Sequence, residues 1–312
     1  MPRVELSTPE PELKLLHLRP GECMNKSIRM RGVFILFAAQ IAGAAQVRTT
    51  PESADRRQPI YRIEVVQRST KAVNYGHRSL PTKVDLAGTV LAPHARGEAK
   101  VESKRGSVDI DVKVEKLFAP TRFGAEYLTY VLWAITPEGR PTNLGELVLD
   151  GGDKGKLEVT SELQAFALLV TAEPYFAVTQ PSDVVVMENV IRPDTVGKVE
   201  EVFAKYELLP RGHYTYQRRA GDAPPPAAGE KLPMDQYEAV LALYQAFNAI
   251  QIARAAGADS QAASTMKRAE QLYEEARTLQ SKNAASGQVI MMARQAAQTA
   301  EDARAIHTRR SQ

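Results

Sequence analysis

Hydrophobic and polar residues alternate along the part of the chain that begins near Ile60. The clearest alternation covers 108–115, where every second residue is apolar and the residues between are charged: Val108, Ile110, Val112 and Val114 against Asp109, Asp111, Lys113 and Glu115. A period of two is typical of a half-buried strand. The segment 99–103 and the turn residues 104–107 precede it. Together they predict an antiparallel hairpin with one wet face.

Other short segments before and after this hairpin also have strand character. They cover 60–66, 84–89, 126–135, 146–149, 157–159, 166–171 and 183–190. The run 126–135 is apolar on both faces, so we expect it at the centre of the sheet. Short strands separated by Gly and Pro turns predict an antiparallel β-sandwich. Trp133 on the central strand is compatible with an immunoglobulin-like or transthyretin-like core.

The hydrophobic period changes to that of helices after residue 233. The first predicted helix places five apolar residues on one face: Tyr237, Val240, Leu241, Tyr244 and Phe247. Gly257 ends it, Asp259 or Ser260 caps a second helix, and a third begins near Gly287. The seams of the last two helices are mostly alanine, which lets helices approach closely. We expect an alanine-rich antiparallel helical hairpin or three-helix bundle, close to a coiled coil.

These changes of pattern divide the chain into a β part and an α part with connecting segments. The expected segments are a gene-model extension (1–23), a signal peptide (24–45), a flexible leader (46–58), a β-sandwich domain (59–216), a Pro-rich linker (217–233) and a helical, coiled-coil-like domain (234–310). The linker contains three consecutive prolines, which favour an extended chain.

The segment 24–45 has the three parts of a secretory signal peptide. A cationic stretch that contains Arg29 and Arg31 precedes an apolar run from Gly32 to Ile41, and small residues follow, so cleavage is expected after Ala44 or Ala45. The apolar run is shorter than the roughly 20 residues that a membrane helix needs. We therefore expect translation to start at Met24. The mature protein would lie in the periplasm or cell envelope without a transmembrane span.

Composition narrows the function classes further. Cys23 is the only cysteine and precedes the predicted signal peptide, so the mature chain would have no disulfide, thiol nucleophile or thiolate metal site. Lys and Arg total 40 against 37 Asp and Glu, a net charge of +3. This balance is unlike that of a nucleic-acid-binding protein, and we expect no nucleic-acid partner.

Three patterns resemble sites, but their context favours a structural interpretation. The five histidines, His17, His77, His94, His213 and His307, include no pair at the i, i+4 spacing of a helical zinc site. The Asp109–Asp111 pair resembles a metal-binding DxD, but its alternation places both carboxylates on a wet strand face. The glycines of 151–156 resemble a phosphate loop, but strand alternation follows them instead of a helix. We therefore predict no catalytic, metal or cofactor-binding residues.

Aromatic side chains of the β part suggest one candidate binding surface. Tyr127, Tyr130, Trp133 and Tyr175 could form a platform on which a ligand stacks, and a buried Trp133 would instead make them core residues. A membrane-surface function is disfavoured for the helices, because such helices need bulky apolar residues and a basic face.

Alanine-rich motifs connect the last quarter of the chain to a known family. They occupy 253–258, 269–272, 275–277, 293–297 and 300–304. This region resembles an uncharacterised family of bacterial envelope proteins, domain of unknown function 4398, which often precedes a peptidoglycan-binding domain of the outer-membrane-protein-A type. We expect no part of residues 1–312 to form that domain, and the resemblance implies no catalytic residues. The segments 123–134 and 171–176 resemble secreted bacterial β-sandwich proteins of unassigned function.

The sequence thus favours an exported envelope protein that is not an enzyme and needs no cofactor. The sandwich would be a binding module, and the helices a spacer, a docking surface or a means of oligomerisation. An envelope protein or a cell-wall component is the expected partner. Two alternatives stay open, a periplasmic protein that binds a carbohydrate or small ligand, and a hydrolase with an unrecognised site. A cleft holding a histidine and a carboxylate of shifted pKa would favour the hydrolase.

Overall fold

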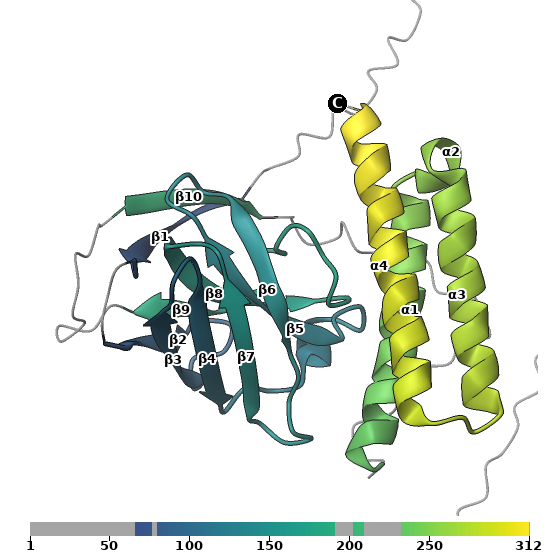
Figure 1. Cartoon of the computed structure of the whole chain (residues 1–312), viewed down its shortest axis with the longest axis horizontal. Coiled ribbons are helices and arrows are strands. Elements are labelled where there is room, and N and C mark those ends of the chain that lie inside the picture. Colours follow the sequence, from purple (N-terminus) through teal and green to yellow (C-terminus); the bar gives the residue numbers. More distant parts are fainter. Residues whose placement is uncertain (1–65, 77–79, 191–201, 209–231, 312) are drawn as a thin grey trace, which may run out of the picture. The chain divides into compact units, whose positions relative to one another are not determined.

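The computed structural model describes residues 66–76, 80–190, 202–208 and 232–311. All of them belong to one compact unit, Ile60–Gln312. A β-rich domain is followed by a helical region (Figure 1), so the predicted order of β part and α part is confirmed. The expected gene-model extension, signal peptide and leader, and all but the last residues of the expected linker, lie outside the described residues.

The β domain is a single antiparallel sheet. Its described strands are β1 (Val66–Asn74), β2 (Thr82–Gly88), β3 (Arg96–Ser103), β4 (Val108–Glu115), β5 (Thr129–Ile135), β6 (Pro141–Leu147), β7 (Gly155–Ser161), β8 (Ala165–Glu173), β9 (Val185–Val190) and β10 (Val202–Leu208). The main path of hydrogen-bonded neighbours is β10-β1-β8-β9-β2-β3-β4-β7, and β5 pairs with both β6 and β8. The strand β8 is therefore the centre of the sheet, with three partners.

The sheet curls until its ends almost meet. Followed from neighbour to neighbour, the strands β6-β5-β8-β9-β2-β3-β4-β7 form a path with β6 at one end and β7 at the other. These two strands are nevertheless consecutive in the chain. The turn 148–154 joins them, and Leu149 forms a β-bridge with Gly155. A Cβ on Gly145 would lie 3.5 Å from a Val159 side-chain carbon, so β6 faces β7 closely although no ladder joins them. The result is a nearly closed antiparallel sheet.

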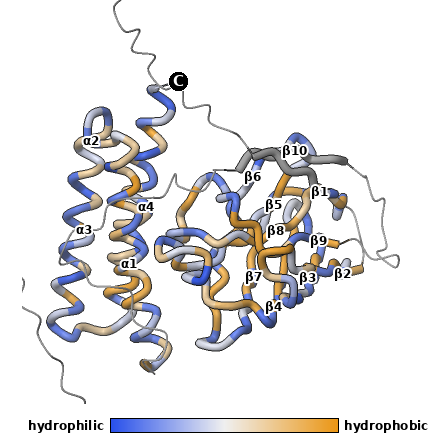
Figure 2. Tube along the Cα trace, turned by 180° about the vertical axis from the view of Figure 1, so that it is seen from behind, coloured by the Kyte–Doolittle hydropathy of each residue, from blue (hydrophilic) through white to orange (hydrophobic). Residues whose placement is uncertain are grey.

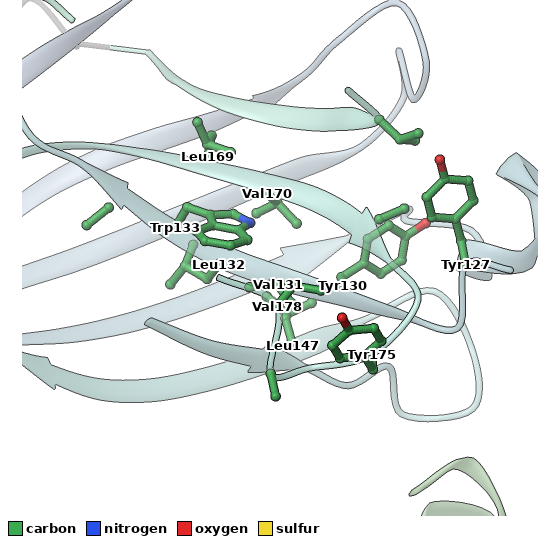
Figure 3. Close-up of a cluster of buried hydrophobic side chains, with 14 of the residues drawn as sticks. Tyr127, Tyr130, Val131, Leu132, Trp133, Leu147, Leu169, Val170, Tyr175 and Val178 are labelled. Atoms are coloured by element: carbon green, nitrogen blue, oxygen red, sulfur yellow. The ribbon is translucent and has the colours of Figure 1, made fainter. Parts of the chain in front are cut away.

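The core lies along β5 and β8. Every residue of β5 is buried, and β8 is buried from Phe166 to Glu173. The inner strand predicted over 126–135 is confirmed for 129–135, which pairs with β6 on one side and β8 on the other. Figure 3 shows the side chains of Trp133 on β5 and of Leu169, its partner on β8, among the buried hydrophobic residues. Figure 2 shows the hydrophobic residues concentrated along these strands. The predicted β3–β4 hairpin is also confirmed, with Val108, Ile110, Val112 and Val114 buried.

Some elements differ from the sequence prediction. The strand β6 covers Pro141–Leu147 and so begins five residues before the strand predicted over 146–149. The strand β10 was not predicted, and a single 3₁₀ turn covers Pro120–Phe123. Proline is compatible with the start of a strand at the edge of a sheet, which is the position of β6.

The helical region contains α1 (Met234–Ala255), the single turn α2 (Ala258–Gln261), α3 (Ala263–Ser281) and α4 (Ser286–Ser311). The three long helices pack against one another. Gly257 takes a φ of 90° between α1 and α2, a left-handed conformation that suits glycine at a helix end. None of the described helices is long and apolar enough to cross a bilayer.

Candidate functional site: a polar joint and an adjoining cavity

The loop 174–184 after β8 is where the helices contact the β domain. It connects β8 to β9, and side chains of α1 and α4 bond to its backbone and to its hydroxyl groups. A buried loop must satisfy its backbone polar groups, and these helix side chains provide hydrogen-bond partners for them. We call the contacts of this loop and of Glu146 with α1 and α4 the polar joint.

Glu301 of α4 is the centre of the polar joint and has no exposed surface. Its Oε2 accepts hydrogen bonds from the Tyr175 hydroxyl at 2.6 Å and from Arg304 Nε at 2.7 Å. Its Oε1 accepts from Arg304 Nη2 at 2.7 Å and from the backbone N–H and hydroxyl of Thr179, at 3.1 and 2.6 Å. A buried carboxylate is tolerated only when it is paired and bonded in this way.

Tyr175 stays a hydrogen-bond donor in this contact. Burial raises the pKa of its hydroxyl well above the usual value, and the nearby Glu301 carboxylate raises it further. The neutral phenol therefore persists at any pH at which the protein would work, and its proton points to Glu301.

The helix α1 adds two amide side chains to the joint. Gln245 accepts a hydrogen bond from the backbone N–H of Phe176 at 3.0 Å, and Asn248 donates to the carbonyls of Glu126 and Pro174 at 3.0 and 3.3 Å. Both amides are buried. They are one helical turn apart, so they lie on the same face of α1.

A second ion pair crosses between Glu146 on β6 and Arg294 on α4. The Glu146 side chain is 5 % exposed, and it accepts hydrogen bonds from Arg294, from Thr129 at 2.7 Å and from Gln245 at 2.5 Å. The Arg294 guanidinium also lies over the ring of Phe176, 3.7 Å from its centroid, a favourable cation–π geometry. Both buried carboxylates of the joint therefore have an arginine and further donors.

Glu173, at the end of β8, is a third buried carboxyl beside the joint. Its Oε1 accepts hydrogen bonds from the Thr171 hydroxyl and from the backbone N–H of Ser182, and Thr171 in turn accepts from Trp133 Nε1 at 2.8 Å. Burial raises the pKa of Glu173 to about 8, and the Glu301 carboxylate adds to the rise. Glu173 is therefore protonated at neutral pH and serves the core as a neutral group.

A cavity of about 770 Å³ lies between the sheet and the start of α1. Its walls come from β3, β4, β7, the turn 148–154 and the first turns of α1, where Met234 and Glu238 lie. Ligand pockets in proteins have volumes of roughly 300–1,000 Å³, so the size suits a small molecule. The polar joint holds α1 against the sheet and thereby maintains one wall of this cavity.

A second hollow of about 460 Å³ lies on the outer face of the β3–β4–β7 sheet and includes both aspartates of the DxD pattern. As predicted, they lie on the wet face of β4 between buried residues. The Asp109 carboxylate accepts a hydrogen bond from the Thr160 hydroxyl at 2.9 Å. Among the described residues, no group of three His, Cys, Asp or Glu side chains could hold a metal ion.

The four aromatic residues of the predicted platform are all buried: Tyr127, Tyr130, Trp133 and Tyr175 are at most 1 % exposed (Figure 3). They pack in the core or bond within it, as Tyr130 does by donating to the Phe118 carbonyl at 2.7 Å. A ligand would reach these rings only after a rearrangement, and their role in ligand stacking stays a prediction.

The two histidines in the described part of the chain, His94 and His307, do not line the cavity. His94 is exposed in a turn, and His307 on α4 faces Gly257. His17, His77, His213 and the predicted cleavage residues Ala44 and Ala45 lie outside the described residues. The segment 151–154 is a turn that leads into β7, as predicted. Lys154, Gly155 and Lys156 line the cavity.

Sequence reasoning missed the residues that matter most here, Glu301, Gln245 and Asn248. The available signal was their spacing, because Gln245 and Asn248 follow Leu241 at four and seven residues. A polar residue at such a position is expected to be buried and to need a partner.

No model of a protein family, no curated protein and no solved structure matches this chain.

Proposed function

We propose that this protein is an exported, non-enzymatic cell-envelope protein whose β domain and helices act together as one binding body. The observation that carries the proposal is the polar joint, in which Glu301 and Glu146 each tie α4 to the β domain. Breaking such buried pairs is costly. The helices therefore serve as a docked part of the binding body, and the role of a free spacer is disfavoured.

Two features of the sequence support export and an envelope location. The segment 24–45 has the layout of a signal peptide, and the helices resemble the domain of unknown function 4398 family of envelope proteins. We further propose that the β domain is a variant of the immunoglobulin-like or transthyretin-like sandwich, closed further between β6 and β7, and that α1, α3 and α4 form a three-helix bundle.

Export is tested by the mature N-terminus. The full chain with a C-terminal tag is expressed in a Gram-negative bacterium, the periplasm is released by osmotic shock, and the intact mass is measured. We expect a protein that begins directly after Ala44 or Ala45. A mature N-terminus upstream of Met24, or recovery only from the cytoplasm, would contradict export. A variant with Ala42, Ala44 and Ala45 changed to Lys is the control and should stay uncleaved.

A second candidate function, small-ligand binding, is favoured by the cavity of about 770 Å³. No aromatic residue lines it, so carbohydrate recognition by ring stacking is the weaker form of this hypothesis. A hydrolase is not favoured, because Glu173, the one described carboxyl whose pKa is raised to about 8, lies sealed in the core beside Thr171 and Ser182. Neither His94 nor His307 is among its hydrogen-bond partners.

A further inference from the structure

The cavity beside α1 is lined by charges of both signs. Among its cations, Lys113 on β4 and Lys154 in the turn 148–154 make no ion pair within the described residues. Arg96 is oriented by its Nη1, which donates to the carbonyls of Pro93 and Ala95 at 3.0 and 2.7 Å. Three positive groups are therefore available to a ligand carboxylate.

Carboxylates on the other walls are equally available. Glu115 at the end of β4 and Glu238 on α1 line the cavity, and in the described part of the chain neither is engaged in an ion pair. By contrast, Glu98 pairs with Lys83 at 3.1 Å, and Asp150 accepts from the backbone N–H groups of its own turn. The available negative groups therefore lie at the end of β4 and on the helix wall.

The cavity also has an apolar surface. Val148 and Met234 line it, and Met234 is 40 % exposed. An unbranched methionine adapts its shape to different apolar groups. At Gly97 and Gly155 the wall has no side chain. A ligand that satisfies this lining needs a cation, an anion and an apolar group within one small molecule.

We propose that the cavity binds a zwitterionic ligand of the short-peptide class, with its carboxylate toward Lys113 and Lys154 and its ammonium group toward Glu238. Its apolar side chains would contact Met234 and Val148. The balanced lining, with four basic and four acidic residues, disfavours a purely anionic ligand, because the carboxylates would repel it. The inference rests on the small-ligand function proposed above and names the ligand class for that cavity.

The probe for this proposal is the dipeptide leucyl-leucine, compared with its N-acetylated form and its C-terminal amide. Binding to the ¹⁵N-labelled full chain is followed by amide chemical shifts. We expect saturable shifts in β3, β4, β7 and the first turn of α1, with the free dipeptide binding at least about 10-fold more tightly than either blocked form, as one charged contact of about 1.4 kcal/mol requires.

Charge-reversal variants then assign each end of the ligand. Glu238→Lys should weaken binding of the free dipeptide about 10-fold and leave the N-acetylated form unchanged, because that form has no ammonium group. Lys113→Glu should weaken the free and the acetylated dipeptides but leave the amide unchanged. Glu275→Lys and Lys267→Glu, on exposed positions of α3, are the matched controls and should change nothing.

The outcomes separate the ligand class from the cavity function. Equal binding of free and blocked dipeptides in the cavity would overturn the zwitterion assignment while keeping small-ligand binding. Shifts confined to other surfaces, or none up to 10 mM (about 2.7 kcal/mol of binding), would overturn both.

Discussion

At the scale of one residue, Glu301 is the centre of the polar joint. Its carboxylate is fully buried and accepts five hydrogen bonds, so its substitution tests the joint directly. Glu301→Ala removes the carboxylate that accepts hydrogen bonds from Tyr175, Thr179 and Arg304, whose side chain is 15 % exposed. Because a buried ion pair loses one of its two partners, we expect a loss of roughly 3–5 kcal/mol in the free energy of unfolding, measured by urea denaturation.

The control for this variant is an exposed pair of the same type and spacing. Arg277 contacts Glu274 at 3.1 Å, with both side chains more than half exposed. Glu274→Ala should change the free energy of unfolding by no more than about 1 kcal/mol. Similar losses in the two variants would show that Glu301 is not a buried anchor.

Glu173 makes stability depend on pH. Its pKa is raised from 4.5 to about 8 by burial, so the unfolded chain releases this proton at lower pH than the folded protein does. The stability contribution of the protonated carboxyl is complete below pH 4.5 and is lost as pH rises toward 8, by up to about 1.4 kcal/mol per pH unit.

Glu173→Gln removes this titration while keeping an oxygen that can accept from Thr171 and Ser182. Between pH 4.5 and about 8 the wild type should lose stability relative to the variant. The unfolding free energy of the variant minus that of the wild type should therefore rise over this range and stay constant above it. Urea denaturation at five pH values measures it. A difference that stays constant over this range would mean that Glu173 ionises normally.

At the scale of elements, the hydrophobic periodicity predicted where strands and helices lie more accurately than it predicted which of their faces are buried. The strands β4 and β5 follow directly from alternation and from a doubly apolar run. The helix α1 was predicted with Tyr237, Leu241 and Phe247 on its packed face, but these are only half-buried, and its most buried residues include Ala246, Gln245 and Asn248. Packing on two sides, against the other helices and against the β domain, removes the single apolar stripe.

The polar joint could not have been predicted because its partners are distant in sequence. Glu301 and Tyr175 are separated by 126 residues, and Arg294 and Glu146 by 148. Nothing in the local pattern at Pro174–Tyr175 indicates a helix partner. The cavity was missed for the same reason, since its walls come from four strands or turns and from α1.

The turn at Gly257 gives a prediction for the helical region. Gly257 and Gly106 have similar φ values of 90° and 86°, but a Cβ on Gly257 would lie 3.1 Å from the His307 ring, whereas nothing lies within 4 Å at Gly106. Both alanine variants incur the left-handed cost of roughly 1–2 kcal/mol. We expect Gly257→Ala to lose about 1 kcal/mol more because the ring must move.

Thermal and urea unfolding of both glycine variants measures this difference. Gly287→Ala, in the first turn of α4 where a Cβ would also meet nothing, is the reference for a glycine without a positive φ and should be neutral or stabilising. Equal losses for Gly257→Ala and Gly106→Ala would mean that His307 is free to move away, and that the α2 turn is not packed against α4.

At the scale of the whole molecule, the β domain and the helices form one cooperative body. The sequence indicated two successive parts joined by a Pro-rich segment, which by itself suggests independent modules. The buried contacts of Glu301, Glu146 and Asn248 change that interpretation, because each bonds one part to the other. Cooperative unfolding of the described unit follows from them.

The most direct test follows both parts during one urea titration. Trp133, the only tryptophan, lies in β5, so its fluorescence reports on the β core. Ellipticity at about 222 nm reports on the α-helices. We predict coincident transitions for the wild type and separated transitions for the double variant Glu301→Ala/Arg294→Ala, with the helices unfolding first. Two separate transitions in the wild-type protein would contradict the account.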